Sequence, residues 1–175
     1  MRRTSLTAVL LSATVIAVAA FAQTPPAEPK VDARALGYAR ETVKTLDDVY
    51  KTAIVVFTDK FVSEAGDVPA GAFAVPWMEE VTKHGSHTVR LIDVTGEPID
   101  EKNVAKSDFE KAAVKKIIDG ETYVERTATA EGKPVLWVAT AVPVVMDKCV
   151  LCHPNYKDVA EGHAIGAITY EIPIR

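Results

Sequence analysis

Apolar residues recur at alternating intervals of three and four positions from Ala33 onward. The positions of this seam are Leu36, Ala39, Val43, Leu46, Tyr50, Ala53, Phe57 and Phe61. Such spacing is typical of a helix that packs along one face, and it persists for about three heptads. It predicts a long N-terminal helix of about 30 residues, roughly 45 Å at 1.5 Å per residue. Two uses of the seam stay open: pairing with a second copy in a homodimer, or packing across a sheet of the same chain.

Shorter patterned segments follow this helix. Residues 65–75 are rich in Gly, Pro and Ala and predict a loop before a short helix at residues 77–83. Residues 87–94 have the composition of a strand and end at a turn. The run Ser107-Asp108-Phe109-Glu110 is a capping box, so it predicts the start of another helix, which Gly120 ends. The buried face predicted for that helix is Phe109, Ala113, Val114, Ile117 and Ile118.

The last third of the chain is dominated by strand patterns. Residues 122–128 and 135–145 predict two strands joined by a hairpin turn at residues 130–133, and residues 164–173 predict a final strand. The segment 135–145 is almost wholly apolar, so we expect both of its faces to be covered, with a bound cofactor as one candidate cover. The order of elements predicts an α+β fold, in which an antiparallel sheet is flanked by helices and preceded by the long one.

The N-terminus has the pattern of an export signal. Residues 1–22 begin with two arginines, continue with an apolar stretch, and end in the small-residue pattern Ala-Phe-Ala. We interpret them as a cleaved signal peptide that directs the protein to the periplasm. The apolar stretch is shorter than the roughly 20 residues of a membrane span, so we expect no span after cleavage; an uncleaved anchor is the alternative. Residues 23–32 are proline-rich and predict a tether, and residues 33–175 predict one domain.

The charge of the chain limits its partners. The formal net charge is −4, and loss of the two arginines of the signal makes the mature chain more acidic. We find no basic patch with interleaved aromatic residues. We therefore expect no nucleic-acid partner.

Both cysteines of the chain lie in the run Cys149-Val150-Leu151-Cys152-His153. This Cys-x-x-Cys-His pattern is how exported proteins attach haem covalently. Cys149 and Cys152 would form thioethers with the porphyrin vinyl groups, and His153 would bind the iron. The motif therefore predicts one covalent haem c.

The motif has three alternative uses. A thioredoxin-like dithiol precedes most of its fold, whereas only 23 residues follow Cys152 here. A zinc site with His163 as fourth ligand requires the adjacent Cys152 and His153 to close one tetrahedron, which is sterically awkward. A plain disulfide leaves His153 without a role. Haem attachment accounts for all three residues of the motif.

Several segments and their order carry a resemblance to a known family. They are Gly96-Glu97-Pro98-Ile99-Asp100 with Asn103, then Asp108-Phe109-Glu110, Cys149 to Pro154, and Gly166-Ala167-Ile168. In these the chain resembles the periplasmic single-haem c domains with a PAS-like sensor fold, found as stand-alone secreted proteins and as sensor modules of chemoreceptors and histidine kinases. The resemblance implies a PAS-like fold. The chain lacks the family's usual proline-rich run after Asn103, and it has no third cysteine for a distal thiolate ligand.

The ligand opposite His153 is the open question of the site. Met78 follows Pro76 in a segment that resembles a proline-to-methionine segment of family members, and we predict it as a weak second iron ligand. Ordinary core packing is the alternative for this thioether. The other candidates are His84, His87, Met146 and His163. We expect the position to be weakly held or open.

Two function classes follow. The first is a redox- or gas-responsive sensor component or small electron carrier, with a diatomic gas as ligand and a separate redox or signalling protein as partner. The second is a haem enzyme acting on peroxide or a nitrogen oxide, which needs a distal base or charge beside an open iron. No Arg-His pair at suggestive spacing supports the enzyme. We therefore predict electron transfer or sensing rather than catalysis.

Overall fold

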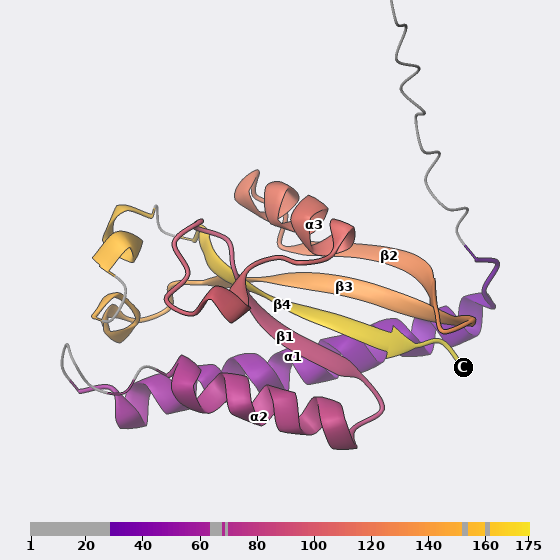
Figure 1. Ribbon diagram of the computed structural model, residues 1–175, viewed down its shortest axis with the longest axis horizontal. Helices are drawn as coiled ribbons and strands as arrows, with labels where there is room; N and C mark the ends of the chain where they lie inside the picture. The colour runs from indigo at the N-terminus through magenta and orange to yellow at the C-terminus, as the bar shows by residue number, and fades with distance from the viewer. Residues whose placement is uncertain (1–28, 64–67, 69, 152–153, 160–161) are drawn as a thin grey trace, which may run out of the picture.

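A computed structural model describes residues 29–63, 68, 70–151, 154–159 and 162–175 (Figure 1). The predicted signal peptide, most of the tether, and Cys152 and His153 lie outside the described residues.

A four-stranded antiparallel sheet forms the centre of the domain. Its strands are β1 (Thr88–Asp93), β2 (Tyr123–Ala130), β3 (Lys133–Pro143) and β4 (Ala164–Pro173), in the order β1-β4-β3-β2. The predicted hairpin between β2 and β3 is confirmed. Its two turn residues, Glu131 and Gly132, both have positive φ, as the tightest hairpin turns require. β3 and β4 are antiparallel neighbours, and the connection between them contains Cys149. Its described residues project from one end of the sheet (Figure 1).

Helices cover both faces of this sheet (Figure 1). α1 (Ala33–Phe61) and α2 (Gly71–His84) lie on one face, and α3 (Asp108–Ile118) lies on the other. The short 3-10 helices η1 (Glu101–Asn103), η2 (Asp147–Val150) and η3 (Pro154–Asp158) lie in the connections. None of the helices in the described part of the chain is long and apolar enough to cross a membrane. The predicted α+β fold is confirmed.

The apolar seam of α1 packs on the sheet of the same chain. Val43 and Tyr50 are 1 % and 2 % exposed and belong to one core cluster with Leu136 of β3, while Leu36 and Leu46 pack against that cluster. Packing within the chain therefore accounts for the seam. A homodimer remains a prediction, and it would have to use another face of the helix.

A polar anchor also ties α1 to the sheet. The Asp47 carboxylate accepts hydrogen bonds from Thr140 Oγ1 at 2.5 Å and from Tyr170 Oη at 3.0 Å. Burial and the neighbouring Asp47 carboxylate raise the pKa of Tyr170 far above its ordinary value. The phenol therefore stays protonated and serves as a donor. This pair of bonds positions α1 along β3 and β4.

α2 is longer than the sequence pattern predicted. It begins at Gly71 instead of Trp77, and Pro76 lies inside it. A proline inside a helix removes one backbone hydrogen bond, so local sequence argued for a loop. Ala74 is fully buried and Met78 is 1 % exposed on the inner side of α2. Burial against α1 and the sheet stabilises the additional turns despite the local signal.

The predicted capping box of α3 is confirmed. The Glu110 amide donates to Ser107 Oγ at 3.1 Å, and the Ser107 amide donates to Glu110 Oε2 at 3.0 Å. Phe109, Ala113 and Ile117 are buried as expected. Ile118 was predicted to be buried, but it is 55 % exposed. Ile118 is the last residue of α3 and lies about 100° around the helix axis from the buried Ile117.

β3 is covered on both faces, as predicted, but by helices. Leu136 and Val138 belong to the cluster under α1, whereas Ala139 belongs to the cluster under α3, and Trp137 packs on Phe109 with ring centroids 5.9 Å apart. The suggestion that a cofactor covers one face of this strand is therefore wrong for most of its length. α3 already occupies that place.

Candidate functional site

A cavity of about 400 Å³ lies at the end of the sheet from which the cysteine segment projects. Its wall is formed by α1 and α2, by the ends of β1, β3 and β4, and by the segments around η1, η2 and η3. The apolar members of the lining are Ile54, Val62, Ala70, Ala72, Val75, Pro76, Leu91, Ile92, Pro98, Ile99, Val142 and Ile165. Its volume and mostly apolar wall are typical of a small-molecule or cofactor site.

Cys149, the first cysteine of the motif, lies in the wall of this cavity. It is half-buried within η2, and its amide donates to the Met146 carbonyl at 3.0 Å. The preceding residue, Lys148, donates from Nζ to the Asp59 carbonyl at 2.5 Å and reaches Asp59 Oδ1 at 3.3 Å. η2 is thereby attached to the end of α1, which holds Cys149 at the cavity.

The described residues on either side of the rest of the motif line the same cavity. Cys149 precedes Cys152 and His153, and Tyr156 of η3 follows them; both Cys149 and Tyr156 are lining residues. Burial, with the nearby Asp93 and Cys149, raises the pKa of Tyr156 above its ordinary value, so its phenol is neutral at neutral pH. The structure thus brings both flanks of the motif to one cavity.

The charged side chains that the described residues contribute to the lining are Glu79, Asp93, Asp100, Lys102 and Lys148. The Asp93 carboxylate accepts from Thr95 Oγ1 at 2.7 Å and from the Gly96 amide at 2.6 Å, which closes the turn after β1. Asp100 caps η1 by accepting from the Lys102 amide at 2.8 Å. Asp93 and Asp100 therefore stabilise turns in the wall of the cavity.

The structure does not bring Met78 to this cavity. Met78 lies in the core cluster with Tyr50 and Leu136, whereas Val75, Pro76 and Glu79 of the same helix line the cavity. Met78 is one turn along α2 from the lining residue Val75, but its side chain is 1 % exposed and packs in the core cluster. The iron-ligand role of Met78 remains a prediction, and its position favours the alternative of core packing.

The described histidines also lie elsewhere. His84 is exposed and contacts Glu80 at 2.8 Å. His87 Nε2 and Tyr50 Oη are hydrogen-bonded at 2.9 Å beneath α2, and burial lowers the pKa of His87. His163 is exposed and lines a separate, more open hollow beside α3. Met146 is half-buried at the start of η2 and is not among the residues that line the cavity.

Comparison with known proteins places the chain in a family. Residues 12–173 match the family model of Tll0287-like proteins. The chain belongs to the Tll0287-like family. It is also similar to the crystal structure of the cyanobacterial heme-protein Tll0287, with a TM-score of 0.59 and 12 % identity over 82 % of this chain and 97 % of that one. No curated protein matches it.

At that identity the structural similarity concerns the fold. It supports the α+β, PAS-like architecture that the sequence resemblance implied. The share of the Tll0287 chain that is covered, 97 %, means that the two proteins share the whole domain and not a single motif.

Sequence reasoning missed part of the site. Among the missed lining residues are Ile54 and Thr58 of α1 and Lys102 of η1. Ile54 widens the apolar stripe of the long helix, which was a signal that this side of α1 contacts something. Pro98, Ile99 and Asp100 lie in a segment that carried the family resemblance, and they do line the cavity. No local pattern marked Lys102.

Proposed function

We propose that this protein binds one haem c covalently in the cavity and acts in the periplasm as a redox- or gas-responsive component. The observation that carries the proposal is the position of Cys149, the first cysteine of a Cys-x-x-Cys-His motif, in the wall of a mostly apolar cavity of about 400 Å³. Cys149 and Cys152 would form the thioethers, and His153 would bind the iron. The similarity to a heme-protein of the same fold supports the assignment.

The described residues suit a porphyrin. Side chains such as Ile54, Leu91 and Val142 offer apolar contacts to a flat ring, and Lys102 adds a cationic side chain to the same wall, where the carboxylates of haem need cationic partners. When bound, haem supplies an iron that exchanges one electron and binds small ligands. The apolar wall would exclude water from that iron, and η2 would hold one attachment point.

The cavity also bears on the sixth coordination position. The lining contributed by the described residues contains no Met or His side chain. For Met78 to bind the iron, its side chain would have to leave the core cluster. We therefore propose that the position opposite His153 is open or weakly held, which permits a diatomic gas to bind.

The proposed signal would pass from the cavity through α1. Ile54, Thr58 and Val62 of α1 line the cavity, and α1 runs along the whole sheet (Figure 1). A change of ligand or charge at the iron would alter contacts with the end of this helix. The resulting shift in conformation would be available to a separate partner protein.

The attachment is tested by intact mass. Protein made with the c-type cytochrome maturation machinery is expected to show the mature chain plus one haem. The Cys149→Ala, Cys152→Ala double variant is expected to lose the covalent pigment. A mature chain that carries only an internal disulfide, or pigment that survives in the double variant, would overturn the proposal.

The role of the iron is tested by visible spectra. The reduced protein is expected to bind carbon monoxide with a change in its Soret band. If carbon monoxide leaves the spectrum of the reduced protein unchanged, the iron is held by two strong ligands. Only the electron-carrier function would then remain.

A further inference from the structure

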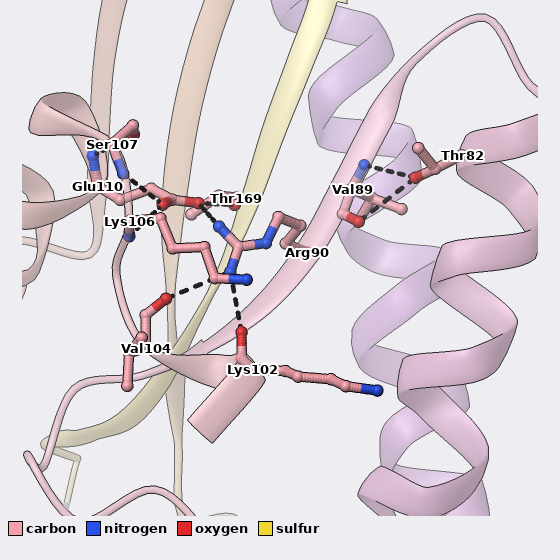
Figure 2. A network of polar contacts seen from close by, with 9 residues as sticks. All are labelled: Thr82, Val89, Arg90, Lys102, Val104, Lys106, Ser107, Glu110 and Thr169. Atoms are coloured by element: carbon pink, nitrogen blue, oxygen red, sulfur yellow. Dashed lines mark hydrogen bonds and ion pairs between the residues drawn. The ribbon is translucent and has the colours of Figure 1, made fainter. Parts of the chain in front are cut away.

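The segment between β1 and α3 forms one wall of the cavity, and an arginine holds its backbone in place. Arg90 of β1 is directed toward the α3 side of the sheet, where its Nη2 donates to the Lys102 carbonyl at 3.0 Å and to the Val104 carbonyl at 3.2 Å (Figure 2). Two carbonyls on opposite sides of Asn103 are thus fixed by one guanidinium group. The position of η1 therefore depends on the position of Arg90.

Arg90 is itself held by Glu110. Its Nη1 donates to Glu110 Oε1, and Thr169 of β4 donates to the same oxygen at 3.3 Å. Glu110 Oε2 accepts the backbone amides of Lys106 at 2.7 Å and Ser107 at 3.0 Å (Figure 2). The Glu110 side chain is 8 % exposed, so this carboxylate is surrounded by protein groups and not by water. The network connects the cap of α3, the sheet and η1.

The consequence at the cavity concerns Lys102. With its carbonyl held by Arg90, its side chain extends away from the network (Figure 2) and lines the cavity with Pro76 and Glu79 of α2. The ion pairs among the described residues include Lys148, which is bound to Asp59, but they do not include Lys102. Lys102 is thus an exposed cation that lines a mostly apolar cavity, and the network that holds its backbone does not use its charge.

We propose that Lys102 binds a carboxylate of the porphyrin in this cavity and that Arg90 is the positioning residue that holds Lys102 there. This inference rests on the proposed function. A carboxylate that enters a mostly apolar site needs a charged partner to offset its lost hydration. The directed contacts of Arg90 reduce the freedom of the loop and hence the entropy cost of forming that ion pair.

The test compares two probes that share one porphyrin ring, one with free carboxylates and one with the carboxylates methylated. Zinc protoporphyrin IX and its dimethyl ester are titrated into the full chain made without haem, and binding is followed by porphyrin fluorescence. We expect the dicarboxylate to bind more tightly than the ester. Lys102→Met should weaken the binding of the dicarboxylate by about tenfold, because a charge-assisted hydrogen bond is lost, and should leave the binding of the ester unchanged. Lys102→Arg should retain the preference, and Lys44→Met, at an exposed position of α1 outside the cavity lining, is the matched control.

Arg90→Lys separates positioning from folding. A lysine can pair with Glu110, but its single nitrogen cannot also occupy the place of Nη2, which contacts both carbonyls. We expect this variant to bind the ester like the wild type and to lose the preference for the dicarboxylate. Loss of binding to both probes would mean that Arg90 is needed for the fold and would contradict its role as a positioning residue.

The holoprotein provides the second measurement. Its midpoint potential is followed against pH, and Lys102→Met is expected to move the pH-dependent step upward, since loss of the ammonium raises the pKa of a porphyrin carboxylate. An unchanged step, or equal binding of both probes by the wild type, would overturn the role of Lys102 and leave the haem site standing. Failure of the holoprotein to form would overturn the proposed function instead.

Discussion

The two faces of the sheet are held by different kinds of interaction. Under α1 and α2 the contacts are mostly apolar and aromatic, with Tyr50, Met78 and Leu136 among the most deeply buried side chains. Under α3 a smaller apolar cluster lies beside the Arg90–Glu110 ion pair and its backbone contacts. Apolar contacts have little directionality, whereas hydrogen bonds do. The first face therefore supplies the bulk of the core, and the second determines where a cavity loop lies.

The largest effect is expected from a charge placed under α1. Val43→Asp buries a carboxylate at a position that is 1 % exposed, and we expect loss of more than about 4 kcal/mol, enough to abolish cooperative unfolding in urea. Val49→Asp, at a position 51 % exposed on the same helix, is the control. A Val43→Asp variant as stable as the control would contradict packing of the seam in the core of its own chain.

The second-largest effect is expected from loss of the Arg90–Glu110 ion pair under α3. Glu110→Ala leaves the Arg90 guanidinium without its carboxylate at a half-buried site, and breaking such a pair costs about 3–5 kcal/mol. Urea unfolding measures the loss. Asp108→Ala, on the exposed side of the same helical turn, should cost less than about 1 kcal/mol. Equal losses in the two variants would mean that the network contributes nothing beyond ordinary helix capping.

Two variants of Met78 distinguish a role in core packing from a role in iron binding. In the core, Met78→Ala should cost about 2–5 kcal/mol and Met78→Leu less than about 1.5 kcal/mol, because leucine conserves the volume. With packing alone, Met78→Leu leaves the haem spectrum and the rate of carbon monoxide binding unchanged. Faster carbon monoxide binding in both variants would identify the thioether as an iron ligand, and its side chain would then have to leave the core cluster.

The smallest effect is the dependence of stability on acid. Burial raises the pKa of Glu110, but the amides of Ser107 and Lys106 and the charge of Arg90 outweigh it and hold that pKa below its ordinary value. Stabilisation from a lowered carboxyl pKa is complete above the unfolded pKa of about 4.3 and is lost as pH falls through the folded pKa. Glu110→Gln should therefore show a flatter decline of urea midpoints below about pH 5. A decline as steep as in the wild type would assign acid sensitivity to other carboxylates.

Local signals predicted the elements that depend on neighbouring residues. The capping box at Ser107 and the turn at Glu131 and Gly132 act within a few residues, so the pattern was sufficient for both. The predicted start of α2 was wrong, because there the local pattern and the long-range packing disagree. Its Gly, Ala and Pro content is typical of a loop, and only the burial of Ala74 against distant residues makes it a helix.

By itself, the sequence determined the α+β class, the lengths of α1 and α3, and the chemistry expected of Cys149, Cys152 and His153, because each of these depends on local spacing. Tertiary structure decided that the seam of α1 packs on its own sheet, that α3 covers the second face of β3, and that Met78 lies in the core. Ile54, Lys102 and Cys149 are far apart along the chain, and they share a cavity because the strand order β1-β4-β3-β2 brings their segments to one end of the sheet. Long-range pairing of this kind leaves no periodic signal in the sequence.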